Sequence, residues 1–250
     1  MVAEFIADGR QQYIMNGRKP FEELEPLEHE TAIVDQALGE LVRAGMLPGA
    51  GYDRELMLAH RSSIRACCEV PSTAVTPRME RLLYAICDIA RPKRVVAAGV
   101  YCGYTFLSAI GAAVGPGRTY VAEELVGLDI DAEMAEVAER NVRRIDPTGT
   151  ARIVVQDARD YVAAGSEPID LLYLDADVAG KNKDLNLGIL RASWNRLRPG
   201  GLVLLHDSVM PLFVDQLSGY LSFVRGARFD GSVNIVFDNF GLEVSRKARW

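Results

Sequence analysis

From Arg94 onward, short apolar segments of strand type alternate with longer segments of helical type. The strand-type segments are residues 94–100, 119–130, 151–157, 169–175 and 201–207, and the helical ones are residues 104–114, 131–145, 158–165 and 185–197. This alternation predicts an α/β fold with a Rossmann-like, doubly wound, mostly parallel sheet and helices on both faces. Residues 227–247 differ, because two strand-type segments flank a turn at 238–241 and predict an antiparallel C-terminal hairpin.

The first part of the chain, residues 1–75, is predicted to be a helical extension. Apolar residues recur with helical spacing in 28–45 and 53–69. Because an apolar stripe must be buried somewhere, we expect these helices to cover the ligand pocket and to contribute to a homodimer. A third helix is predicted after Thr76, and with it begins the α/β ligand-binding domain, residues 76–250.

Charge and hydropathy narrow the classes of partner. The net charge of −6 and the pI near 5.2 argue against bulk electrostatic binding to nucleic acid or to an anionic membrane. No apolar run approaches the roughly 20 residues that span a bilayer, and the acidic start does not read as a secretion signal. We therefore expect a cytoplasmic protein. Cys67, Cys68, Cys87 and Cys102 form no CxxC pair and are expected to be reduced.

A glycine-bearing turn follows the first of the alternating strand-type segments. Gly99 and Gly103 lie where a strand ends and a helix begins. Glycine at such a junction permits a tight turn or the close approach of a ligand. The turn has neither the GxGxxG dinucleotide pattern nor the GxxxxGK[ST] phosphate loop, so it favours a nucleoside ligand of another kind.

Acidic residues end the next two strand-type segments. Asp129 is placed to accept hydrogen bonds from both ribose hydroxyls, and Asp131 is better placed than Asp129 to cap the following helix. Glu123 is a competitor for the ribose role. Asp157 and Ala158 suit the edge of an adenine ring, with a helix N-cap as the alternative role for Asp157.

Carboxylates recur at the ends of the fourth and fifth strand-type segments. Asp175 and Asp177 end the fourth, and His206, Asp207 and Ser208 end the fifth. Adjacent parallel strands bring their carboxyl ends together, so Asp175 and Asp207 are expected to converge. Such oxygen clusters suit Mg²⁺ or Ca²⁺, or the acceptance of a proton. The alternatives are ordinary turn chemistry for the acids and a core position for His206.

From about Val70 to its end, the chain resembles class I S-adenosylmethionine-dependent methyltransferases, most closely the small-molecule O-methyltransferases related to caffeoyl-CoA and catechol O-methyltransferases. The motifs that carry the resemblance are GVYCGYT, LDID, QDAR, YLDAD and RPGGLVLLHDS. The resemblance implies S-adenosylmethionine as cofactor and residues 76–250 as the domain that binds it. It implies the cofactor-binding residues Gly99, Tyr101, Gly103, Thr105, Asp129, Ile130, Asp157, Ala158 and Asp175.

The family's metal site is only partly present. By resemblance, Asp175, Asp207 and Ser208 hold a divalent cation, but the family has asparagine where Ser208 stands. A serine hydroxyl is a weaker ligand than an amide carbonyl, so we expect Mg²⁺ to bind loosely at most. Without a metal, Asp175, Asp207 or His206 acts as the base, and these three are the candidate catalytic residues.

Other positions depart from the family pattern as well. The family has an acid where Ala97 stands and a lysine where Val178 stands, and Lys181 and Lys183 lie nearby but out of register. The segment 119–128 is also longer than the family's second strand.

The resemblance implies methyl transfer to a small molecule, with a phenol or sugar hydroxyl as the expected acceptor, in natural-product biosynthesis. No nucleic acid or membrane partner is expected. One alternative is a methyltransferase-fold enzyme that performs C-methylation or ring closure, such as cyclopropane formation. A second alternative is a non-catalytic binding protein.

Overall fold

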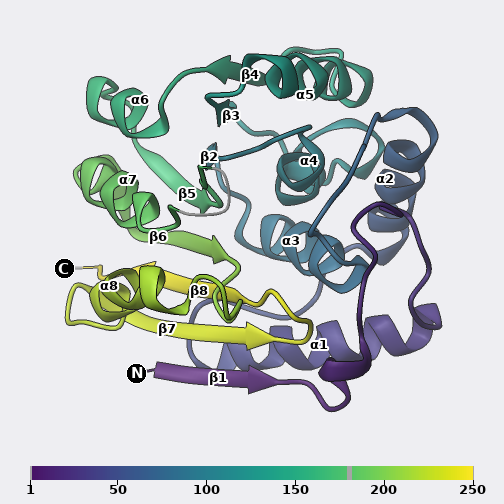
Figure 1. Cartoon of the computed structure of the whole chain (residues 1–250), viewed down its shortest axis with the longest axis horizontal. Coiled ribbons are helices and arrows are strands. Elements are labelled where there is room, and N and C mark those ends of the chain that lie inside the picture. The colour runs from purple at the N-terminus through teal and green to yellow at the C-terminus, as the bar shows by residue number, and fades with distance from the viewer. Residues whose placement is uncertain (1, 179–181, 250) are drawn as a thin grey trace.

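The computed structural model describes residues 2–178 and 182–249 and arranges them as an eight-stranded mixed sheet between two layers of helices (Figure 1). The helices are α1 (Leu27–Arg43), α2 (Arg54–Cys67), α3 (Pro77–Ala90), α4 (Tyr104–Ile110), α5 (Ala132–Ile145), α6 (Ala158–Ala164), α7 (Leu185–Ser193) and α8 (Val214–Val224). The strands are β1 (Val2–Ile6), β2 (Arg94–Ala98), β3 (Glu124–Asp129), β4 (Ala151–Val155), β5 (Ile169–Leu174), β6 (Leu197–His206), β7 (Phe229–Val236) and β8 (Leu242–Lys247). None of these helices is long and apolar enough to cross a membrane.

The strand order is β1-β7-β8-β6-β5-β2-β3-β4. Strands β2 to β6 pair in parallel, and β8 lies antiparallel between β6 and β7. The predicted doubly wound α/β sheet with an antiparallel C-terminal hairpin is therefore confirmed. In Figure 1 the carboxyl ends of the central parallel strands meet at one edge of the sheet, which is where such folds bind their ligands.

Alternate residues of the parallel strands pack against opposite helical layers. In β2, Val95 and Ala97 belong to the apolar core on the side of α1, α3 and α4, whereas Val96 and Ala98 belong to the core beneath α6, α7 and α8. Both faces are covered, so these strands read as almost continuous apolar runs. This is why the alternation of apolar runs with helical segments is so clear in the sequence.

The N-terminal residues Val2–Ile6 form an edge strand, β1, which pairs in parallel with β7. The helical expectation is wrong for these five residues. Ala3 and Phe5 pack against the core while Glu4 and Ile6 are exposed, which is the two-residue period of a strand. So short a segment carries too few alternations to be distinguished from the start of a helix.

The predicted helices of the extension are present, and their apolar stripes face the core of their own chain. Leu38 and Leu41 of α1, and Met57 and Ile64 of α2, are 1% exposed or less. Helix α1 packs against α3 and α2 against α5. The stripes are thus already covered within one chain, so they offer no argument for a second copy, and the homodimer stays a prediction.

The long segment before the second parallel strand splits into a loop and a strand. Strand β3 begins only at Glu124. In the preceding loop, the Thr119 hydroxyl donates to Asp88 at 2.5 Å and the Tyr120 hydroxyl donates to the Pro92 carbonyl at 3.0 Å. The additional residues therefore fasten this loop to the C-terminal end of α3 rather than lengthen the strand.

The four cysteines are free thiols, as their spacing indicated. Cys87 and Cys102 are buried, and burial raises the pKa of both thiols. They behave as small core residues.

His60 joins α2 to α4 and to the turns that follow α4. Its side chain is buried, and its Nε2 lies 2.9 Å from the Leu107 carbonyl oxygen. A Cβ added at Gly111 or Gly117 would lie 2.7 Å from the His60 side chain, so these glycines make room for it. Burial lowers the pKa of His60 to about 4, and the hydrogen bond with Leu107 opposes this only in part.

This burial predicts acid sensitivity in a defined window. The folded state excludes a proton that the unfolded chain binds below about pH 6.5. The stabilisation is present above pH 6.5 and is lost as the pH falls toward 4. Between these values the free energy of unfolding should fall by up to about 3 kcal/mol more in the wild type than in His60→Leu. Urea denaturation at stepped pH measures this difference, and parallel pH profiles would contradict it.

The turn after β2 lies against the end of β5. Gly99 has φ +77°, and a Cβ there would lie 2.7 Å from the Asp175 carbonyl oxygen. Gly149 has nearly the same backbone, with φ +78°, but no described atom lies within 4 Å of where its Cβ would be. Comparing substitutions at the two glycines therefore distinguishes the cost of the backbone conformation from the cost of close packing.

We expect Gly99→Ala to destabilise the protein more than Gly149→Ala. The second change carries only the left-handed backbone cost of roughly 1–2 kcal/mol. The first adds a clash with the backbone of Asp175 and Ala176, just after β5, worth roughly a further 1–3 kcal/mol of overpacking. Chemical denaturation of both variants provides the comparison, and equal losses of stability would mean that the close approach carries no energetic weight.

Candidate active site

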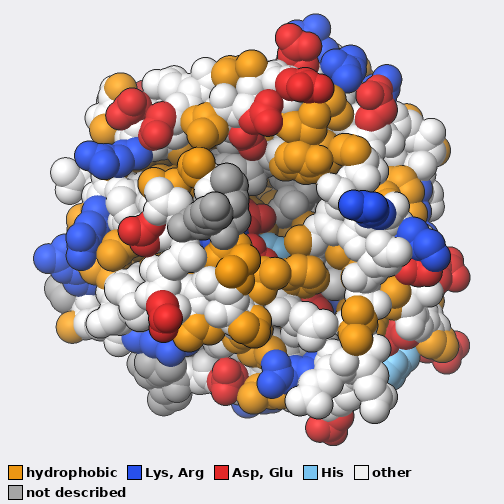
Figure 2. All heavy atoms as spheres, viewed as in Figure 1, with side chains coloured by type: hydrophobic (Ala, Val, Ile, Leu, Met, Phe, Trp, Pro, Cys, Tyr) orange, Lys and Arg blue, Asp and Glu red, His pale blue; other side chains and the backbone are white. Residues whose placement is uncertain are grey.

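A cavity of about 730 Å³ lies at the carboxyl ends of β2, β3, β4 and β5. Small-molecule sites in proteins span roughly 300–1,000 Å³. In Figure 2 the centre of the molecule is hollowed, with acidic side chains and a histidine at the floor of the hollow. The cavity is lined by Gly99, Tyr101, Leu128, Asp129, Ile130, Asp131, Gln156, Asp157, Ala158, Arg159, Asp175, Ala176, Asp177, Val178, Asn182, Asp184, Leu185, Gly188 and Ile189.

Seven of the nine predicted cofactor-binding residues belong to this lining. Gly103 and Thr105 are not among the described lining residues. Gly103 caps α4 with φ +84°, and a Cβ there would lie 3.1 Å from Ala138 of α5. Its absent side chain therefore allows two helices to pack closely, which is a structural reason for a glycine at this position of the motif.

The glycine turn is fixed to the end of β3. Tyr101 has an unusual φ of +49°, and its backbone N–H donates to the Asp129 carboxylate at 2.7 Å. Asp129 also accepts from the backbone N–H of Asp131 at 3.0 Å. Asp131 itself caps α5, as expected from the sequence, and Asp129 lines the cavity. Glu123 lies before β3, where it pairs with Arg94 at 3.0 Å, and it is not part of the described lining.

Asp157 acts as a helix cap. One of its oxygens accepts from the backbone N–H groups of Arg159 at 2.7 Å and Asp160 at 3.2 Å. The N-cap alternative is thus present in the structure. The same residue lines the cavity together with Gln156 and Ala158, so capping holds this segment in place at the cavity wall.

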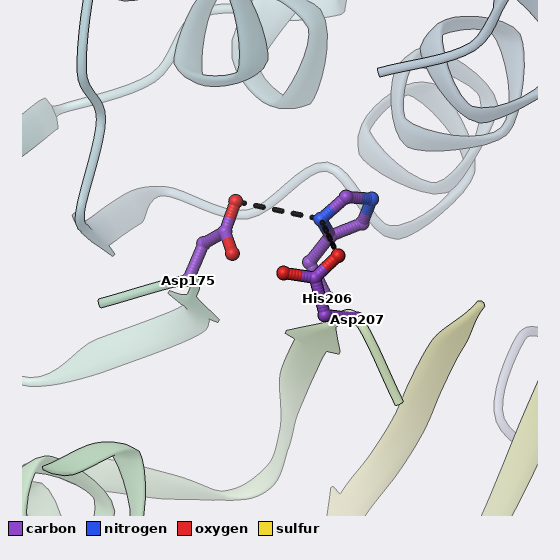
Figure 3. A group of neighbouring side chains, drawn as sticks. All are labelled: Asp175, His206 and Asp207. Carbon is purple, nitrogen blue, oxygen red and sulfur yellow. Dashed lines mark ion pairs between the residues drawn. The ribbon is translucent and has the colours of Figure 1, made fainter. Parts of the chain in front are cut away.

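The predicted convergence of acids occurs at the tips of β5 and β6. Figure 3 shows Asp175, His206 and Asp207 pointing toward one another, with one nitrogen of the His206 ring turned toward both acids. His206 Nδ1 lies 3.4 Å from Asp175 Oδ2 and 3.3 Å from Asp207 Oδ1. The imidazole is fully buried and stacks on Phe240, with ring centroids 5.7 Å apart.

Lys183 completes this cluster. Its ammonium contacts Asp175 Oδ1 and lies 2.8 Å from Asp207 Oδ2. Two carboxylates therefore face two nitrogen groups from different parts of the chain. Ser208 does not join them, because its hydroxyl donates to Asn234 Oδ1 at 2.7 Å.

The charges in the cluster support one another. Burial lowers the pKa of His206, but the carboxylates of Asp207 and Asp175 outweigh burial and raise it to about 9. Burial raises the pKa of Asp175, but Lys183 and His206 together bring it below its usual value. The same carboxylates keep the pKa of Lys183 above its usual value against the effect of burial. At neutral pH His206 and Lys183 thus both carry a proton, and both contact Asp175 and Asp207.

Asn186 is a site residue that the sequence analysis did not identify. Its amide accepts from the backbone N–H of Ala176 at 3.1 Å and donates to the carbonyls of Ala176 at 2.8 Å and Lys183 at 2.9 Å. It ties the end of β5 to the start of α7. Nothing in the local sequence distinguishes this asparagine from an ordinary helix residue.

The other positions that differ from the family pattern lie in different environments. Ala97 is fully buried in the core, and Val178 is 44% exposed and lines the cavity. Asp177 also lines the cavity, and its carboxylate accepts from the backbone N–H of Asn182 at 3.1 Å. Lys181 lies outside the described residues.

We compared the chain with known protein families and with known proteins. Residues 96–208 match a family described as a methyltransferase domain. No curated protein matches the sequence of the chain.

Solved structures share the fold at low sequence identity. An O-methyltransferase from Bacillus cereus in complex with SAH superposes with a TM-score of 0.59 at 16% identity, covering 86% of this chain and 96% of that one. The O-methyltransferase TomG from Streptomyces achromogenes, in complex with SAM, gives 0.59 at 16% identity, covering 79% and 91%. A candidate caffeoyl-CoA O-methyltransferase from Staphylococcus aureus gives 0.56 at 13% identity, covering 86% and 99%. Residues 96–208 are therefore similar to a methyltransferase domain, and the chain has a fold that it shares with O-methyltransferases.

Proposed function

We propose that the protein transfers a methyl group to a hydroxyl of a small molecule, a phenol or a sugar-bearing natural product. The observation that supports this proposal most strongly is that Asp175 belongs to two parts of the site. It lines the cavity and also belongs to the buried cluster with His206, Asp207 and Lys183. The titratable side chains of the cluster therefore lie next to the cavity in which we place the methyl donor.

The lining of the cavity fits S-adenosylmethionine. Asp129 offers a carboxylate to the ribose hydroxyls, and Asp157 and Ala158 offer a polar group and a backbone N–H to the adenine edge. Gly99 and Tyr101 line the cavity in the glycine turn, which by the family resemblance would lie beneath the methionine end of the cofactor. When bound, this cofactor supplies an electrophilic methyl group on a cationic sulfonium. The B. cereus and S. achromogenes enzymes of the same fold were solved with SAH and SAM, respectively.

The chain's own residues would position the acceptor and take its proton. At neutral pH the imidazole of His206, with a pKa of about 9, already carries a proton and cannot accept another. Asp175 and Asp207 are then the proton acceptors, while the charges of His206 and Lys183 favour the ionised form of a nearby hydroxyl. Holding the acceptor in a near-attack geometry supplies much of the rate enhancement.

A product assay tests this function. The protein is incubated with deuteromethyl-labelled S-adenosylmethionine and a panel of phenols and glycosylated natural products. The expected product carries the labelled methyl on oxygen, as identified by mass spectrometry and NMR. A label on carbon or a ring-closed product would instead favour the other chemistries. No binding of the cofactor would favour a non-catalytic protein.

Asp207→Asn should lower kcat by roughly 10²–10⁴-fold, the usual contribution of a general base. Asp207 is not among the described residues that line the cavity, so cofactor affinity should change little. Measuring both quantities on the same preparation distinguishes loss of the base from loss of the fold. An unchanged kcat would remove Asp207 from the mechanism.

Asp129→Ala should weaken binding of S-adenosylhomocysteine by about 1.5–3 kcal/mol, the value of hydrogen bonds to a charged group. Titration calorimetry measures this change. The matched control is Glu123→Ala, which removes a carboxylate at the other end of the same strand and should leave affinity unaltered. Equal affinities in the two variants would exclude Asp129 from the cofactor site.

A further inference from the structure

Lys183 is buried to an unusual degree for a lysine. Its side chain is 2% exposed. The ammonium contacts the carboxylates of Asp175 and Asp207, and it also faces the ring of Phe213 at 5.3 Å. A lysine is rarely buried this far unless its charge is paired, and here two acids from two strands pair it.

The backbone of Lys183 is held as firmly as its ammonium. Its N–H donates to Gln216 of α8 at 2.7 Å, and its carbonyl accepts from Asn186 at 2.9 Å. The side chain thus starts from a fixed point and ends between two carboxylates. Both ends of Lys183 are therefore held in place by specific contacts, unlike those of a surface lysine.

The cluster does not fit a divalent cation as the family pattern would have it. Asp175, His206 and Asp207 each offer a ligand atom within 4.8 Å of the others. However, Lys183 already contacts both acids, and the hydroxyl of Ser208 is engaged by Asn234. A metal bound between the acids would have to displace the ammonium and leave it buried without a partner, which is strongly unfavourable.

We propose that Lys183 is a built-in cation that stands where related enzymes hold a metal, and that it positions Asp175 and Asp207 so that the site works without a divalent ion. This proposal rests on the proposed methyl transfer for its catalytic consequence. Lys183 is a positioning residue, because it acts through the two acids. Its register differs from that of the family's lysine, so the sequence pattern alone does not reveal it.

The test is a titration with Mn²⁺, read as free Mn²⁺ by electron paramagnetic resonance. Lys183→Ala and Lys183→Gln should each bind one Mn²⁺ per chain, at least about tenfold more tightly than the wild-type protein does. Lys93→Ala removes an exposed lysine beside β2 and should behave as wild type. Thermal melting establishes that each variant is folded, and two substitutions guard against one that does not fold.

Measurements of turnover provide a second, independent test. Wild-type turnover should persist in excess chelator, and the Lys183 variants should lose turnover in chelator and regain part of it with Mn²⁺. Tight Mn²⁺ binding by the wild type, or no binding by folded variants, would overturn the proposal. The Mn²⁺ titration needs no acceptor, so it decides the role of Lys183 even if no methyl transfer is found and the proposed function fails.

Discussion

The ion cluster at the tips of β5 and β6 is the interaction on which the site depends. Adjacent parallel strands bring Asp175 and Asp207 together, and two carboxylates in a buried setting repel each other. The ammonium of Lys183 removes that repulsion and ties the loop before α7 to both strand ends. Breaking a buried ion pair by removing one partner typically costs about 3–5 kcal/mol, so the cluster stabilises this edge of the sheet as well as arranging its chemistry.

The sheet topology explains why the cavity and the cluster are neighbours. Strand β2 pairs with β3 on one side and β5 on the other. The chain therefore departs in opposite directions from this point, and the connections leave a crevice at the carboxyl ends of the strands. The nucleoside-binding candidates come from β2, β3 and β4, and the proton-handling groups come from β5 and β6. Asp175 belongs to both sets because β5 lies between them.

The sequence predicted the parallel core well because strands buried on both faces leave strong local patterns. Asp131 as a helix cap and the turn at 238–241 were equally accessible, since each depends on neighbouring residues only. The role of Lys183 was not accessible. It depends on where a loop returns to the sheet and on contacts with Gln216 in a helix more than thirty residues away. Strand β1 was missed because it pairs with residues at the far end of the chain.

The position of β1 also determines how the sheet ends. Strand β7 is largely buried on both faces, with Val233 and Ile235 fully enclosed, and the five residues of β1 pair with its outer backbone groups. An uncovered strand of this kind is a template for pairing with another chain. Residues 2–6 thus close this edge of the sheet. Deleting them would leave β7 as an exposed edge strand. The expected result is aggregation through this edge, whereas the cavity at the ends of β2 to β5 would stay intact.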